Sequence, residues 1–196
     1  MDLNESTQQY YKDNAVSFSE STKSVDMSEL YDRFLPYLAS GTFILDAGCG
    51  SGRDAKHFQS LGHKIAAFDA SLELAQLASK YLQIDVPVKT FQTFDAVNSF
   101  DGIWCCASLL HVPKAELEDA IARLRRALKV DGVLYMSFKY GDQERVKDGR
   151  FFCDQNEETI TEYIDGFKVL DTWVTGDQRE GRSNERWLNL IIKKLA

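Results

Sequence analysis

The chain has 196 residues and a formal net charge of −7, and 44% of its residues are hydrophobic. This length and apolar content suit one domain with a substantial core and are too small for two well-formed domains. The acidic balance makes nucleic acids and anionic membrane surfaces poor partners, because both carry negative charge.

The N-terminal residues MDLNESTQQYYKDN are polar and lack the apolar core of a signal peptide. No apolar run approaches the length of a membrane span. The four cysteines form no C-x-x-C pair, and no histidine lies at ligand spacing from one of them. We therefore expect a cytoplasmic protein with free thiols and no bound metal.

The first 40 residues are predicted to be helical. Asp26 and Glu29 resemble a capping box, and the apolar residues after them share one helical face. We expect a single domain over residues 1–196, in which an N-terminal helical lid segment, 1–40, covers a core at 41–196.

From Phe43 onward short apolar runs alternate with helical patterns, which favours a parallel sheet covered by helices. The two last runs, FKVLDTWVTG and RWLNLIIKK, are joined by a loop too short for a helical crossover, so they should pair antiparallel. The segment KVDG is expected to be a turn. The other expected strands are 43–45, 64–68, 86–91, 102–106 and 133–138, and the expected helices are 53–61, 72–82, one after Pro113 and a short one after Asn156.

The stretch ILDAGCGSGRDA places Gly48, Gly50 and Gly52 after Asp46 at the end of a predicted strand. Glycines allow a ligand to approach the main chain, but the G-x-G-x-G spacing is neither the dinucleotide fingerprint nor a Walker motif. The Asp46 carboxylate would repel a pyrophosphate and attract an ammonium group. Asp69, at the end of the second predicted strand, is placed to accept hydrogen bonds from ribose hydroxyls. Together they predict a ligand with a ribose, an amino group and no phosphate, which describes S-adenosylmethionine.

Four segments, ILDAGCGSGRDA, AAFDAS, FDGIWCCASLLHV and LRRALKVDGVLYMSF, resemble the ordered motifs of class I S-adenosylmethionine-dependent methyltransferases. The resemblance extends from Tyr10 to Lys193, and within this class the chain resembles small bacterial tellurite-resistance-type methyltransferases. It implies an α/β Rossmann-like three-layer sandwich with helices on both faces of a mostly parallel seven-stranded sheet, of order 3-2-1-4-5-7-6 with the last strand antiparallel. It also implies methyl transfer to a small-molecule acceptor, by a monomer or homodimer, with S-adenosylmethionine as the cofactor.

The resemblance also implies residue roles. Asp46 and the glycine loop would hold the methionine end of the cofactor and Asp69 its ribose. The family usually has an acid for the adenine amino group after the third strand, where this chain has Thr93 and Phe94. Arg53 is placed either to reach the cofactor carboxylate or to lie in solvent. The expected cofactor-binding residues are Tyr11, Asp46, Gly48, Cys49, Gly50, Gly52, Arg53, Asp69, Ala70, Ser71, Thr93, Phe94, Cys106 and Ala107.

His111 follows the fourth predicted strand, which faces the methyl group in this fold. It is either a general base or substrate contact, or a residue that caps or packs the next helix. The later loops are locally basic, with Arg150, Arg179, Arg182 and Arg186. This indicates either an anionic substrate or ordinary solvated charges. Aromatic residues beside these arginines line a pocket or pack the core, and the expected substrate-binding residues are Arg150, Phe151 and Arg186.

Three alternatives stay open at this point. A protein that binds or senses S-adenosylmethionine without transferring a methyl group has the same cofactor motifs. An NAD-dependent oxidoreductase is opposed by Asp46 and by the glycine spacing. An RNA or protein methyltransferase is disfavoured by the acidic charge and the small size of the chain.

Overall fold

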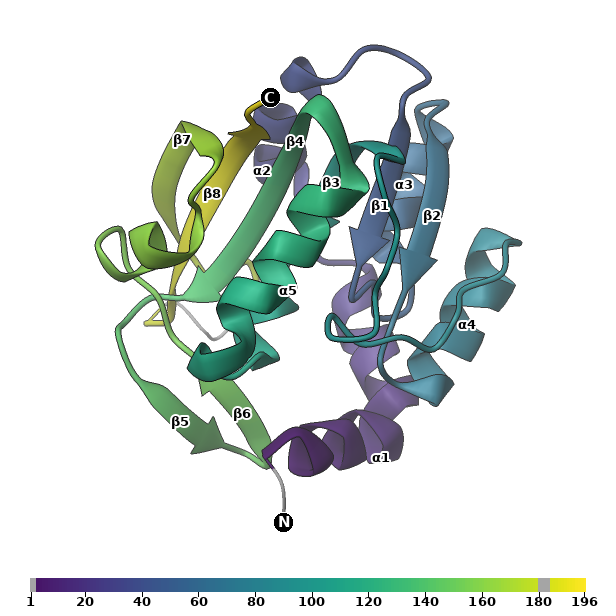
Figure 1. The fold of residues 1–196 in the computed structure, drawn as a ribbon. Coiled ribbons are helices and arrows are strands. Elements are labelled where there is room, and N and C mark those ends of the chain that lie inside the picture. The colour runs from purple at the N-terminus through teal and green to yellow at the C-terminus, as the bar shows by residue number, and fades with distance from the viewer. Residues whose placement is uncertain (1–2, 180–183) are drawn as a thin grey trace.

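A sheet of six strands forms the centre of the computed structural model, which describes residues 3–179 and 184–196 (Figure 1). The strand order is β2-β1-β3-β4-β8-β7, in which β8 runs antiparallel to both of its neighbours and the pairs among the first four strands are parallel. A separate antiparallel hairpin is formed by β5 and β6. The strands are β1 (Phe43–Ala47), β2 (Lys64–Phe68), β3 (Phe100–Cys105), β4 (Leu128–Lys139), β5 (Glu144–Lys147), β6 (Arg150–Cys153), β7 (Phe167–Gly176) and β8 (Arg186–Lys194).

Helices cover both faces of this sheet, which confirms the predicted Rossmann-like α/β class. In Figure 1, α5 lies on the near face, whereas α2 and α3 lie behind the sheet. The helices are α1 (Leu3–Lys23), α2 (Ser28–Phe34), α3 (Arg53–Ser60), α4 (Leu72–Leu82) and α5 (Lys114–Ala127), with 3-10 turns η1 (Leu35–Tyr37), η2 (Leu109–His111) and η3 (Thr159–Tyr163).

The central strands are mostly apolar between their ends, as expected for strands whose two faces are both covered. Neighbouring residues alternate between the two faces, as the period of a strand requires. In β3, Trp104 packs with the α2 side chain Phe34, whereas Ile103 belongs to the core on the α5 side. The indole of Trp104 also stacks on Tyr135 of β4, with 3.9 Å between the ring centroids.

The predicted capping box before α2 is wrong. The Asp26 carboxylate accepts a hydrogen bond from the Ser28 backbone N–H at 2.9 Å, which closes a turn two residues long. Met27 occupies the cap position of the helix without any side-chain bond, and Glu29 lies in the first helical turn. Asp26 therefore fixes the turn between α1 and α2 rather than capping α2.

The third predicted strand, 86–91, is also wrong as a strand. Only one bridge forms there, between Asp69 and Val88. Pro87 lies at the centre of this segment and has no N–H to donate to a strand ladder. The order of the remaining strands agrees with the prediction, so the sheet has six strands instead of seven.

The predicted turn KVDG lies within β4. The partner of Phe100 is Leu128 and that of Gly102 is Val133, so the register shifts where the extra residues are accommodated. Asp131 adopts a left-handed conformation there, with φ of 64°. The turn-forming residues thus produce an irregularity in a continuous strand instead of delaying its start.

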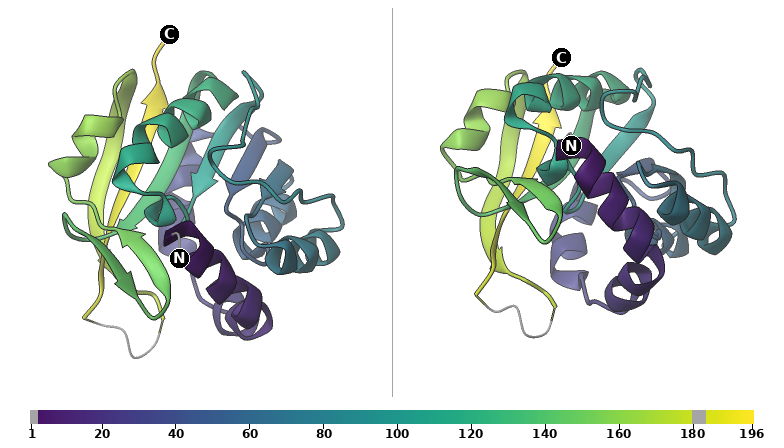
Figure 2. Two further views of the ribbon diagram at one scale, coloured as in Figure 1. Left: turned by 60° about the horizontal axis from the view of Figure 1, so that its bottom comes forward. Right: turned by 90° about the horizontal axis from the view of Figure 1, so that it is seen from below.

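Helix α1 lies across the end of the sheet at which the first strands finish. Seen from below in Figure 2, it crosses the molecule between the β5–β6 hairpin and α4, and it contacts both α4 and β6. Within residues 3–179 and 184–196, no helix combines the length and apolar character that a bilayer span requires.

Candidate active site

A cavity of about 480 Å³ opens between α1 and the carboxyl ends of the strands. In a parallel α/β sheet this is the edge at which ligands bind. Its walls come from the loops after β1, β2 and β3, from the β5–β6 hairpin and from the ends of β7 and β8. Most of the sequence-predicted cofactor residues line it, namely Tyr11, Asp46, Gly48, Cys49, Gly50, Arg53, Asp69, Ala70, Ser71, Cys106 and Ala107.

The glycine loop after β1 is held close to its neighbouring strands. The backbone N–H groups of Gly48 and Cys49 both donate to the Phe68 carbonyl oxygen, at 2.9 and 3.0 Å. Gly48 has φ of 73°, and a Cβ there would lie 2.4 Å from the Cβ of Ser108. The Ser108 hydroxyl in turn donates to the Ala47 carbonyl at 2.7 Å. Gly48 is therefore required by the close approach of the Ser108 loop.

Asp69 connects the glycine loop to the start of α4. One carboxylate oxygen accepts the Gly50 N–H at 2.7 Å, and the other accepts the Ser71 N–H at 2.9 Å. Burial raises the pKa of Asp69 to about 6, although these hydrogen bonds act in the opposite direction. The side chain is thus fixed in position at the cavity wall while it retains acceptor capacity for a ligand.

Asp46 lies deeper in the same wall and is only 3% exposed. It accepts a hydrogen bond from the Ala55 N–H at 3.0 Å. Its pKa is raised well above the usual value, first by burial and then by the charge of Asp54. A cationic ligand group beside Asp46 would favour its ionised form.

Arg53 and Asp54 form a buried network behind the glycine loop. Two guanidinium nitrogens of Arg53 contact the Asp54 carboxylate at 2.6 and 3.0 Å. Asp54 also accepts hydrogen bonds from the Tyr31 hydroxyl at 2.5 Å and from the Trp104 indole at 2.8 Å. Tyr31 and Trp104 are distant from Asp54 in the chain, so the sequence pattern around Asp54 does not reveal this network. Arg53 lines the cavity, but its charge is already paired.

His111 also lines the cavity and is held between two neighbours. Its Nδ1 lies 2.6 Å from the Phe151 carbonyl oxygen, and its Nε2 lies 2.9 Å from the Tyr11 hydroxyl. A carbonyl oxygen can only accept, so Nδ1 carries the proton and Nε2 of the neutral ring accepts from Tyr11. Burial lowers the pKa of His111 to about 4 and raises that of Tyr11 to about 12, so both are neutral near pH 7.

The expected adenine contacts lie outside the cavity wall. Phe94 is buried and stacks on Phe68 with 4.9 Å between the ring centroids, and the exposed Thr93 hydroxyl bonds to Thr90 instead. Phe91 and Gln92 line the cavity in their place, and sequence reasoning missed both. Gly52 also lies outside the wall, at the start of α3.

The three expected substrate residues separate in space. Arg150 lines the cavity, whereas Phe151 and Arg186 do not. Phe151 packs in the core, because successive residues of a strand face opposite ways. The Arg186 guanidinium lies 4.4 Å from the centroid of the half-buried Tyr140 ring. Arg182 is outside the described residues.

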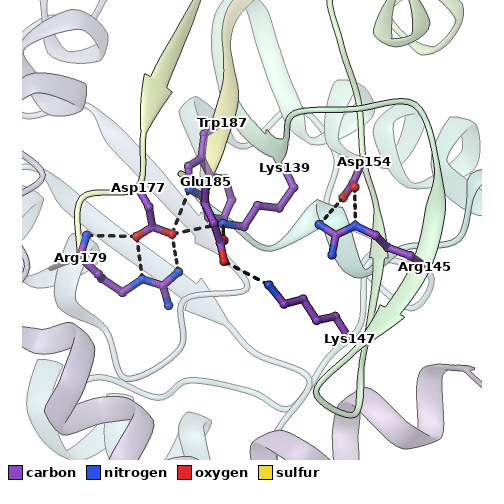
Figure 3. Close-up of polar contacts among 8 residues, drawn as sticks. All are labelled: Lys139, Arg145, Lys147, Asp154, Asp177, Arg179, Glu185 and Trp187. Carbon is purple, nitrogen blue, oxygen red and sulfur yellow. Dashed lines mark hydrogen bonds and ion pairs between the residues drawn. The ribbon is translucent and has the colours of Figure 1, made fainter. Parts of the chain in front are cut away.

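An ion-pair network closes the side of the cavity formed by the sheet's later strands (Figure 3). Lys139, at the end of β4, contacts both Asp177 and Glu185, and its Nζ lies 4.0 Å from the centroid of the Trp187 ring. Arg179 contacts Asp177 through two hydrogen bonds of 2.8 and 2.6 Å. These partners hold the pKa of Asp177 far below its usual value despite partial burial. The network also reaches the β5–β6 hairpin through an ion pair between Lys147 and Glu185.

Known proteins match this fold and this part of the sequence. Residues 44–132 match the family model of a methyltransferase domain. A ubiquinone biosynthesis O-methyltransferase of Xylella fastidiosa is 33% identical over 106 residues, which are 50% of this chain and 42% of that protein. The chain therefore spans less than half the length of this curated relative.

Solved structures extend the similarity over nearly the whole chain. A 1,6-didemethyltoxoflavin-N1-methyltransferase of Burkholderia thailandensis, with bound 1,6-didemethyltoxoflavin and S-adenosylhomocysteine, has a TM-score of 0.78 at 21% identity and covers 96% of this chain and 85% of that one. Phosphoethanolamine N-methyltransferase 2 of Haemonchus contortus, in complex with S-adenosyl-L-methionine, has a TM-score of 0.76 at 16% identity and covers 96% and 58%. The fold is thus the Rossmann-like fold of the methyltransferases.

Proposed function

We propose that the protein is an S-adenosylmethionine-dependent methyltransferase that acts on a small-molecule acceptor. The observation that carries this proposal is the Asp69 carboxylate, fixed by Gly50 and Ser71 at the wall of a cavity at the strand ends. The match of residues 44–132 to a methyltransferase domain and the methyltransferase fold support it.

The residues of the cavity suit each part of the cofactor. Asp69 is placed to accept hydrogen bonds from the ribose hydroxyls, and Asp46 offers its buried charge to the methionine ammonium group. For the adenine, Phe91 supplies an apolar surface and Gln92 a polar group. Both residues follow Val88, which forms a bridge with Asp69. Two carboxylates in the wall would repel the pyrophosphate of NAD, which disfavours an oxidoreductase.

The cofactor supplies an activated methyl group on a sulfonium. The acceptor's nucleophilic atom forms a bond to the methyl carbon as the carbon–sulfur bond breaks, which yields the methylated acceptor and S-adenosylhomocysteine. The protein contributes alignment and exclusion of water, and such positioning can lower a barrier by roughly 7–11 kcal/mol. Cys106 and Ala107, directly after β3, line the cavity where the acceptor would meet the methyl group.

With both ring nitrogens engaged by Phe151 and Tyr11, His111 positions Tyr11 at the cavity wall rather than acting as a strong base. An imidazole with a pKa of about 4 binds a proton weakly at neutral pH, and its Nε2 is engaged by the Tyr11 hydroxyl. This favours an acceptor atom whose lone pair is already free at neutral pH, such as an unprotonated ring nitrogen or a sulfur atom. A relation to tellurite resistance stays a prediction from the sequence resemblance.

Transfer of labelled methyl groups tests the proposal. We expect the protein to move label from S-adenosylmethionine into the small-molecule fraction of a bacterial extract, and Asp69→Ala to reduce the rate by at least about tenfold. Tellurite and purified RNA are tested separately as acceptors. Binding of S-adenosylhomocysteine without transfer to any fraction would instead indicate a sensing protein.

A further inference from the structure

The positive charges around the cavity are paired with one exception. Seven lysine and arginine side chains line it among the described residues. Six of them have a carboxylate partner within 4 Å: Arg53 with Asp54, Lys89 with Asp95, Lys139 with Asp177, Arg145 with Asp154, Lys147 with Glu185 and Arg179 with Asp177. Arg150 forms no ion pair within residues 3–179 and 184–196.

Arg150 is nevertheless buried, with only 9% of its surface exposed. Its Nε is shielded from solvent and has no hydrogen-bond partner in the part of the chain that the structure describes. Its guanidinium lies 4.4 Å from the centroid of the Tyr10 ring and 5.4 Å from that of Phe152. The Tyr11 hydroxyl also interacts with the guanidinium. A neutral hydroxyl and two aromatic faces position the guanidinium but do not neutralise it, and a buried charge without a counter-charge is costly.

The hairpin holds this side chain against the cavity. Arg150 is the first residue of β6 and pairs with Lys147 across a two-residue turn. Asp148 and Gly149 have φ of 52° and 74°, as a tight type I′ turn requires. The neighbouring Phe151 N–H donates to the Thr7 hydroxyl of α1 at 2.9 Å, which fastens the hairpin to that helix. Arg150 is therefore preorganised rather than free to turn into solvent.

We propose that Arg150 binds an oxyanionic group of the methyl acceptor, a carboxylate or a phosphate, beside Tyr11 and His111. This inference rests on the proposed function, because it names the chemical class of that enzyme's acceptor. Two parallel N–H···O bonds from the guanidinium supply the missing partners of the charge and fix the acceptor's direction. The acceptor's nucleophilic atom then lies on the side of the cavity that faces Asp46 and the glycine loop.

Binding of three small probes tests this assignment. Benzoate, phenyl phosphate and the neutral benzamide are titrated by ligand-observed NMR, with and without saturating S-adenosylhomocysteine. We expect one of the two anions to bind at least about tenfold more tightly than benzamide, and Arg150→Met to abolish this preference. The anion that binds more tightly distinguishes a carboxylate acceptor from a phosphate acceptor.

A matched control is Arg33→Met. Arg33 also lies over an aromatic ring, at 4.5 Å from Trp173, but outside the cavity, so its replacement should leave anion binding unchanged. Calorimetric binding of S-adenosylhomocysteine by Arg150→Met shows that the variant is folded. The proposal is overturned if no anion binds, if benzamide binds equally well, or if Arg150→Met keeps the preference. If the unmodified protein does not bind S-adenosylhomocysteine, the methyltransferase proposal is refuted instead. The titrations without cofactor still measure anion binding at Arg150 in that case.

Discussion

His111 is fixed in one tautomer by a carbonyl oxygen on one side and a phenol on the other. Because Nδ1 donates to Phe151, the ring presents only a lone pair to Tyr11. Protonation would place a second positive charge in a buried site near Arg150. Burial and this charge both lower the pKa of His111.

We expect the His111 imidazole to titrate near pH 4 in an NMR experiment, well below the usual value of about 6.5. The folded state disfavours the proton, so this group lowers stability as pH falls from about 6.5 to 4. Binding of an anion at Arg150 should raise the midpoint, because it offsets the guanidinium charge. His57, which stacks on Tyr31, provides a second histidine signal for comparison. A midpoint above 6 in the free protein would contradict the described hydrogen bonding.

Site residues divide according to how local their placement is. Asp46 lies near the end of β1, and Gly48 and Asp69 directly follow β1 and β2, so their position could be predicted from the apolar runs before them. Phe94 and Phe151 could not be separated from cavity residues, because one position along the chain decides which face a side chain takes. Asp54 acquires its partners Tyr31 and Trp104 only through the fold.

At the scale of elements, local turn chemistry explains both the successes and the errors. Apolar runs predicted most of the strands and the short last loop predicted the antiparallel end of the sheet, whereas the strand order was implied by the family resemblance. Pro87 is the local signal against a strand at 86–91. Asp148–Gly149 between two short runs is the local signal for the β5–β6 hairpin, which the apolar pattern did not predict. The register shift in β4 depends on packing against β3, and sequence pattern alone does not contain it.

The glycine loop gives a direct test of why Gly48 is needed. Gly48 and Gly41 share φ of 73°, but a Cβ at Gly41 meets nothing within 4 Å. We expect Gly41→Ala to lower the free energy of unfolding by about 1 kcal/mol, the cost of the left-handed conformation alone. Gly48→Ala should cost about 2–4 kcal/mol, because its Cβ also overlaps Ser108. Urea denaturation measures the free energy of unfolding of both variants. Equal decreases in the two variants would show that the close approach of Ser108 to Gly48 does not contribute to stability.

At the scale of the whole molecule, α1 closes the cavity at the end of the sheet. Its residues Thr7, Tyr11 and Thr22 contact the β5–β6 hairpin, the η2 turn and Arg53. In Figure 2, α1 lies between the β5–β6 hairpin and α4, and it contacts both. A ligand between them would therefore tighten the attachment of α1.

We expect S-adenosylhomocysteine at about 100 times its dissociation constant to slow amide hydrogen exchange in α1 by up to about a hundredfold, since ligand linkage supplies about 2.7 kcal/mol at that concentration. The far end of α5, 120–127, packs in the core away from the cavity and serves as the internal control. Unchanged exchange in α1, despite saturation, would show that the helix does not close over the ligand.

The proposed binding of S-adenosylmethionine in the cavity depends on the ionised Asp69 carboxylate. Calorimetric titration with S-adenosylhomocysteine at pH 7 and pH 5 tests it most directly, with Asp69→Asn as the control. The pKa of Asp69 is raised to about 6, so its acceptor form is lost as pH falls. We predict about tenfold weaker binding at pH 5 in the unmodified protein. Asp69→Asn should lose the part of this dependence that comes from Asp69 and keep only the part that comes from Asp46, whose pKa is also raised. Absence of binding at pH 7, or equal affinity of the two proteins at both pH values, would contradict the account.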